Sequence, residues 1–122
     1  MGGHHLRRAL ALALCCFASV PVSAAADAPT GFAICATCHG AHGEGSDAGP
    51  ELRGVLGRKA ASGTDFAYSA AMRRSGKVWT EAEIAAFLLN PQAAVPGTRM
   101  AYPGASTPAE AAALAAYVAM LK

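Results

Sequence analysis

The pentapeptide Cys-Ala-Thr-Cys-His at residues 35–39 constrains this chain more than any other stretch. Cysteines at positions i and i+3 near the end of a helix lie on one face of it, so both thiols can reach the same flat macrocycle. The histidine that follows the second thiol is then held close to the centre of that macrocycle. A C-x-x-C-H sequence is the attachment motif of c-type haem. We therefore predict one covalent haem c, attached through Cys35 and Cys38, with His39 as an iron ligand.

Met100 is the candidate for the second axial ligand of the iron. It ends the segment Pro-Gly-Thr-Arg-Met at residues 96–100, a stiff loop suited to present a thioether. Met72 and Met120 lie instead in helical patterns, where packing in the core is the default role of methionine. A histidine and a methionine together raise the potential of a haem and fill both axial positions, as in electron carriers.

The first 24 residues have the pattern of a secretory signal. Arg7 and Arg8 precede an apolar run over residues 9–20, and small residues follow that run. We expect a signal peptide over residues 1–24, a mature domain over residues 25–122, and a periplasmic location. A retained membrane anchor is the alternative, although the run is shorter than the roughly 20 apolar residues that span a bilayer.

Removal of this segment changes how charge and cysteine content are interpreted. Without Arg7 and Arg8 the count of Lys and Arg falls from 10 to 8, which equals the 8 Asp and Glu. A balanced charge gives no reason to expect nucleic acid or an anionic membrane as a partner. Cys35 and Cys38 are then the remaining cysteines, and a disulfide between them would close a very short loop and stabilise little. A large apolar cofactor, in contrast, would fill the core of a small domain.

Two other uses of the motif fit the sequence less well than haem attachment. A zinc site needs four ligands, usually in separated pairs, whereas the candidates here are crowded within a few residues: Cys35, Cys38, His39 and His42. A thioredoxin-like redox motif needs a βαβ context, and the chain has no strand pattern. His42 fits an exposed loop histidine better than a second ligand.

Helix signals predict a single all-α domain. Capping boxes begin two helices with apolar stripes, at residues 80–83 and 107–110, and Asn90-Pro91 ends the first of them. Asp27 and Asp65 are candidate caps for two earlier helices. The glycine-rich segments between them, residues 40–49 and 52–59, predict loops.

Beyond these inferences, the sequence resembles the small soluble class I cytochromes c, the branch of mitochondrial cytochrome c and its bacterial relatives. The similarity runs from Phe32 to Leu121 with the motifs in family order. Gly49-Pro50 and Leu52 match the family's Gly-Pro-x-Leu segment. The resemblance implies that the Pro50 carbonyl accepts a hydrogen bond from His39 and fixes its tautomer.

The same resemblance implies further cofactor contacts and the packing of the terminal helices. Residues 96–102 match the family's methionine-ligand loop, which makes Thr98 a candidate haem contact beside Met100. Tyr117 would pack the last helix against the first. Three further positions align with contacts to the haem propionates: Arg58, Tyr68 and Trp79.

This sequence also departs from the family at several positions. Phe87 stands where many members have a tyrosine that bonds toward the ligand methionine. The glycine of the first helix is absent from its usual place, with Gly31 near Phe32. The lysine ring of the family is reduced to three main residues: Lys59, Lys77 and Arg99.

We therefore predict a cytochrome c fold, with short helices around one haem and the N- and C-terminal helices packed together. The predicted function is a periplasmic, monomeric one-electron carrier, not an enzyme, that acts on no small-molecule substrate. The resemblance implies a quinol–cytochrome c reductase as donor, and a terminal oxidase, reductase or photosynthetic centre as acceptor. Two alternatives are a haem enzyme or gas sensor with an openable sixth iron position, and a dedicated subunit of one dehydrogenase.

Overall fold

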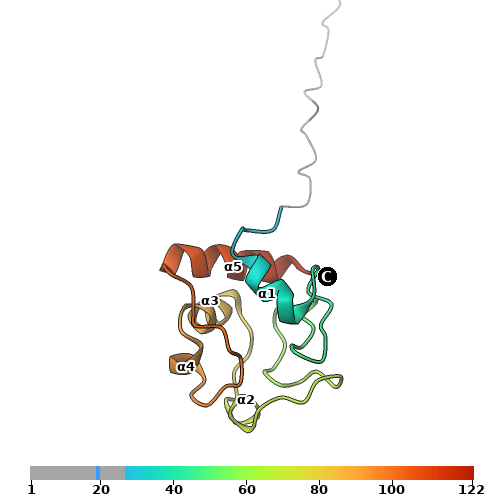
Figure 1. Ribbon diagram of the computed structural model, residues 1–122, viewed down its shortest axis with the longest axis vertical. Coiled ribbons are helices and arrows are strands. Elements are labelled where there is room, and N and C mark those ends of the chain that lie inside the picture. Colours follow the sequence, from blue (N-terminus) through green and yellow to red (C-terminus); the bar gives the residue numbers. More distant parts are fainter. Residues whose placement is uncertain (1–18, 20–26) are drawn as a thin grey trace, which may run out of the picture.

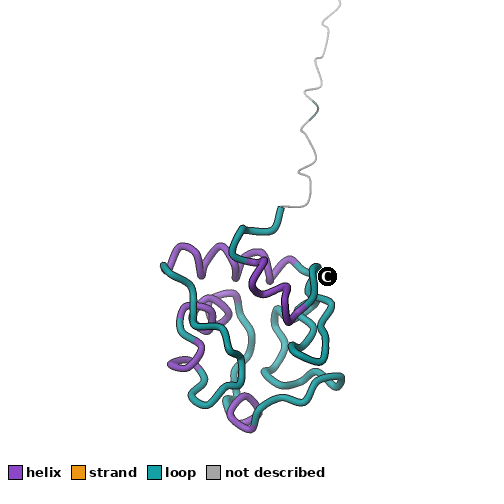
Figure 2. Tube along the Cα trace, viewed as in Figure 1, coloured by secondary structure: helices purple, strands orange, loops and turns teal. Residues whose placement is uncertain are grey.

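The computed structural model describes Ser19 and residues 27–122, and the predicted signal peptide otherwise lies outside these described residues. Within them the chain is helical, with long loops and no strand, so the all-α prediction is confirmed there (Figures 1 and 2). None of the described helices has the length and apolar character to cross a membrane. The helices are α1 (Phe32–His39), α2 (Ala70–Arg74), α3 (Glu81–Leu89), α4 (Pro91–Ala94) and α5 (Pro108–Met120).

The first helix, α1, packs against the last helix, α5. The predicted cap of α5 is present: the Thr107 side chain accepts a hydrogen bond from the backbone N–H of Glu110. Leu114 is completely buried on the inner face of the helix. Phe32 of α1 meets Tyr117 of α5 edge to face, with ring centroids 4.8 Å apart. The terminal helices therefore lie together at one end of the molecule, and α2 lies at the other end (Figure 1).

Helix α3 supplies the second layer of the core and packs on α5. Thr80 caps it as predicted, since its side chain accepts a hydrogen bond from the Glu83 N–H. Ile84, Phe87 and Leu88 are its buried residues. The helix ends before Asn90, as predicted, but the Asn90 side chain then caps a further single turn, α4, which the sequence pattern did not indicate.

Two predicted helix starts were wrong. The first helix begins after Gly31, which provides no side-chain cap, so Asp27 plays no capping role. The N–H of Phe32 instead donates to the carbonyl of Pro29 in the preceding turn. The second helix is capped by Ser69, whose hydroxyl accepts from the Met72 N–H, and not by Asp65.

The long loops between α1 and α3 are tied together by backbone hydrogen bonds. The N–H of Trp79 donates to the carbonyl of Arg58 at 2.9 Å, and the N–H of Gly57 donates to the carbonyl of Trp79 at 2.8 Å. The indole of Trp79 is buried against Phe87, with ring centroids 5.3 Å apart. These contacts fasten the predicted irregular segment at residues 52–59 to α3.

Candidate functional site

His39, the last residue of α1, is held in a defined tautomer. Its side chain is 8% exposed, and its Nδ1 lies 2.7 Å from the carbonyl oxygen of Pro50. Because a carbonyl oxygen only accepts hydrogen bonds, Nδ1 carries the proton and Nε2 keeps a free lone pair. Burial lowers the pKa of His39, and the hydrogen bond to Pro50 opposes that change. The imidazole therefore keeps one ring nitrogen, Nε2, available as a metal ligand.

A tight loop over residues 40–50 brings Pro50 to this position. Ser46 is central to it, since its hydroxyl donates to the carbonyl of Cys38 and its N–H donates to the carbonyl of Gly49. A Cβ atom on Gly49 would lie 3.0 Å from the Cys38 carbonyl oxygen and 3.1 Å from the His39 Nδ1. Glycine at position 49 therefore permits a close approach between this loop and the end of α1.

Replacement of Gly49 by alanine is expected to disturb this approach and tilt the imidazole. We expect the variant to lose about 1–3 kcal/mol of unfolding free energy, as when an extra methyl group enters a packed site. Guanidinium unfolding of the purified holoprotein measures this loss. Ala48→Gly is the control, because it changes an exposed neighbour of Gly49 and should lower the unfolding free energy by less. Gly54→Ala would not serve, because Gly54 has φ +70, a conformation that strains alanine. Equal stability of Gly49→Ala and wild type would contradict the packing argument.

The two cysteines of the motif differ in environment. Cys35 is half-buried and Cys38 is exposed, and neither forms a disulfide. Burial raises the pKa of the Cys35 thiol, and a backbone hydrogen bond partly offsets this effect. Neither thiol is bonded to another cysteine in the structure, so both sulfur atoms are free for thioether attachment.

Met100 lies on a loop that α4 holds in place. The Met100 side chain is half-buried against the core, and its N–H lies 3.4 Å from the hydroxyl of the buried Thr98. The side chain of Gln92 accepts from the Gly97 N–H at 3.2 Å and donates to the Thr98 carbonyl at 2.9 Å. Sequence reasoning missed Gln92, whose role depends on the unexpected turn of α4.

The loops bring together three residues that are distant in sequence: Arg58, Tyr68 and Trp79. A Cβ atom on Gly63 would lie 2.6 Å from the Tyr68 hydroxyl and 3.4 Å from Nη2 of Arg58, so both side chains reach the same glycine. Trp79 joins them through its backbone bond to Arg58. A guanidinium beside a phenol hydroxyl offers hydrogen-bond donors suited to carboxylates.

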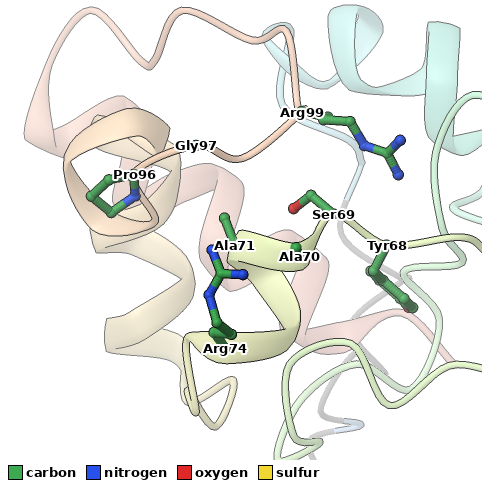
Figure 3. A pocket seen from close by; sticks show the side chains of 8 residues that line it. All are labelled: Tyr68, Ser69, Ala70, Ala71, Arg74, Pro96, Gly97 and Arg99. Carbon is green, nitrogen blue, oxygen red and sulfur yellow. The ribbon is translucent and has the colours of Figure 1, made fainter.

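An open hollow of about 360 Å³ lies next to this group, between the start of α2 and the methionine loop (Figure 3). Arg99 lines one side of it, and its guanidinium donates to the carbonyl of Ala67. The arginines at its border give it a positive character. Its lining residues are Tyr68, Ser69, Ala70, Ala71, Arg74, Pro96, Gly97 and Arg99.

This donor set fits a covalently bound haem c. It offers two reduced thiols, an imidazole nitrogen with a free lone pair, a half-buried thioether, and a guanidinium–phenol pair for carboxylates. A zinc site is not supported in the part of the chain that the structure describes, because no three His, Cys, Asp or Glu side chains gather there as ligands. His42 is exposed and stands apart from His39, with its N–H bonded to the Glu44 carboxylate.

Comparisons with known proteins agree with this chemistry. A family model described as cytochrome c matches residues 25–122. Cytochrome c2 iso-2 of Magnetospirillum fulvum is 38% identical over 96 residues, which cover 79% of this chain and 100% of that protein. Cytochrome c2 of Rhodoblastus acidophilus is 40% identical over 92 residues, or 75% of this chain and 86% of that protein. The solved structure of cytochrome cH from Methylobacterium extorquens is 41% identical, with a TM-score of 0.65, over 71% of this chain and 88% of its own.

Proposed function

This chain belongs to the cytochrome c family, and from that premise we propose that it is a periplasmic one-electron carrier with His39 and Met100 as axial ligands. Membership of the family makes it an electron-transfer protein that carries covalently attached haem c through Cys35 and Cys38, and not an enzyme. The proposal adds the ligand pair, the compartment and the partners.

The observation that carries the ligand assignment is the hydrogen bond of 2.7 Å between His39 and Pro50. Haem c, when bound, supplies a one-electron couple. The Pro50 carbonyl keeps the His39 ring in one orientation and one tautomer, and such a partner raises the basicity of a ligating imidazole. On the other side, Gln92 fixes the loop that presents Met100. Because neither residue has to move when one electron is gained or lost, the chain reorganises little.

The distal segment offers no acid–base pair for an enzyme reaction. Between Ile84 and Ala109 the single charged residue is Arg99, and its guanidinium is engaged by the carbonyl of Ala67. Phe87, buried against Trp79, adds no polar group. These residues favour an electron carrier over the alternative of a haem enzyme or gas sensor.

The proposed compartment and partners follow from the N-terminal pattern and from the family. A signal over residues 1–24 would deliver the domain to the periplasm, where covalent haem attachment and soluble redox partners are found together. As a donor we propose a quinol–cytochrome c reductase, and as an acceptor a terminal oxidase, reductase or photosynthetic centre. Redox encounters of this kind are small and transient.

The optical spectrum of the full chain, expressed with a c-type maturation system and purified from the periplasmic fraction, tests this proposal. We expect a low-spin spectrum in both oxidation states, a weak far-red band of methionine–iron ligation, and no change with carbon monoxide. A high-spin spectrum that shifts with carbon monoxide would mean an open site and would favour the enzyme or sensor. Recovery in the cytoplasmic or membrane fraction would contradict the proposed location.

A further inference from the structure

Gln92 is an exposed side chain whose two polar atoms both bind the backbone of the methionine loop, residues 96–100. Its Nε2 donates to the carbonyl of Thr98 at 2.9 Å, and its Oε1 accepts from the N–H of Gly97 at 3.2 Å. An exposed glutamine is free to bind water instead, and fixing its side chain costs conformational entropy. Two simultaneous bonds to adjacent residues of one loop therefore indicate a specific role for this side chain.

The helical turn that carries Gln92 is fixed to the core. Pro91 begins this turn and Val95 follows it, and both side chains are buried, with Val95 only 2% exposed. The Asn90 side chain caps the turn by accepting a hydrogen bond from the N–H of Ala93 at 3.1 Å. Gln92 therefore projects from a rigid base toward the loop.

Thr98 is the residue through which this base acts on Met100. The N–H of Thr98 donates to the carbonyl of Val95 at 3.0 Å, and its carbonyl accepts from Gln92. Both backbone groups of Thr98 are therefore bound to α4 or to the residue that ends it. The Thr98 carbonyl shares one rigid peptide plane with the N–H of Arg99, so its direction sets the path of the chain toward Met100.

A second tether of the loop has a less rigid partner. The guanidinium of Arg99 donates to the carbonyl of Ala67, and both residues are exposed. This bond joins the methionine loop to another loop, the one that precedes α2. The bonds of Gln92, in contrast, join the methionine loop to a turn packed in the core, so they are the stronger restraint on loop opening.

We propose that Gln92 is a positioning residue that keeps the sixth iron position closed to external ligands. The inference rests on the proposed function, in which Met100 occupies that position. An external ligand can take the place of Met100 only in the fraction of molecules whose loop has moved away from α4. The apparent dissociation constant of such a ligand is its intrinsic value divided by that fraction. Loss of the bonds from Gln92 should raise the fraction and so tighten the binding of small neutral nitrogen bases such as imidazole.

Gln92→Leu tests this proposal, because it removes both hydrogen bonds and leaves no cavity at an exposed position. We expect the ferric holoprotein to bind imidazole about fivefold more tightly, as for two hydrogen bonds of ordinary net strength. The N–H of Gly97 should also exchange with solvent faster than in wild type, a readout that involves no added ligand. Ala93→Leu is the matched control, since it places the same side chain at the adjacent exposed position of α4, and it should behave as wild type.

Gln92→Glu makes the bond to Thr98 depend on pH. An ionised carboxylate accepts from the Gly97 N–H but has no proton to donate to the Thr98 carbonyl, whereas a neutral carboxylic acid can do both. A glutamic acid side chain titrates near about pH 4.3. We expect imidazole affinity, taken relative to wild type at the same pH, to be raised severalfold at neutral pH and to approach the wild-type value as the pH falls toward about 4. A general loss of folding would not reverse in acid.

Unchanged imidazole affinity in Gln92→Leu, or equal tightening in Ala93→Leu, would overturn the proposal. Tighter binding in Arg99→Leu but not in Gln92→Leu would overturn it in favour of the bond from Arg99 to Ala67. Failure of the proposed function would be seen separately, in the wild-type protein, as absence of the far-red band and binding of carbon monoxide.

Discussion

Cys38→Ser is expected to leave most of the protein unfolded and without covalent haem, and Cys35→Ser should have a similar effect. A cofactor that binds only the folded chain contributes its binding free energy to stability, so the yield of folded protein should drop by about tenfold or more. Haem staining of denaturing gels, together with far-ultraviolet circular dichroism of the same samples, measures both losses.

The composition of the core is the physical reason for this expectation. The side chains with no or almost no exposure are modest in size, and the larger buried ones are three aromatic residues: Phe32, Trp79 and Phe87. Several residues of the loops and of α2 that pack against this core are only half-buried: Leu52, Val55, Met72 and Met100. A small domain with a core of this size is marginal by itself, and a haem between α1 and the methionine loop would bury more of these half-buried side chains.

Cys16→Ser is the matched control for these variants, because it makes the same substitution outside the domain that the family model matches. It should leave haem content and helicity unchanged. Abundant, folded and haem-free Cys38→Ser protein would contradict the view that the cofactor completes the core.

The parts of the fold that sequence reasoning located are those determined by local contacts. Thr80 and Thr107 cap helices as predicted because each hydroxyl bonds an N–H only three residues ahead. Asp65 was the predicted cap of the second helix, and Ser69, which the sequence analysis did not consider, is the cap in the structure. The loop before α2 is fixed by hydrogen bonds between segments that are distant in sequence, such as the bond from the Trp79 N–H to the Arg58 carbonyl. A local pattern does not contain these contacts, so it could not place the start of α2 at Ser69.

The residues of the candidate site likewise fall into those that the sequence identified and those that only the folded chain reveals. The attachment motif and the methionine loop are short sequences whose chemistry is visible in the residues themselves. Gln92 was missed because its function is to bind the backbone of the loop from α4. The family resemblance implied that Arg58 and Tyr68 contact the same cofactor groups, but it did not predict their approach at Gly63, since no local pattern relates positions 58, 63 and 68.

Met100→Ala is expected to lower the reduction potential while haem stays attached. Loss of the thioether should shift the potential by about −0.2 V, a modest part of the roughly 0.8 V over which axial ligands set haem potentials. The vacated position should also bind carbon monoxide and imidazole. Optical redox titration and carbon monoxide difference spectra measure the two effects.

Met72→Ala is the control that separates ligation from packing. Met72 is also half-buried against the core, so its truncation removes a thioether of similar burial from the same domain. It should reduce stability by about 2–5 kcal/mol at most, as for other core methionines, but leave the potential and the far-red band nearly unchanged. If Met72→Ala loses that band and Met100→Ala keeps it, the ligand is Met72, and the loop held by Gln92 has a purely structural role.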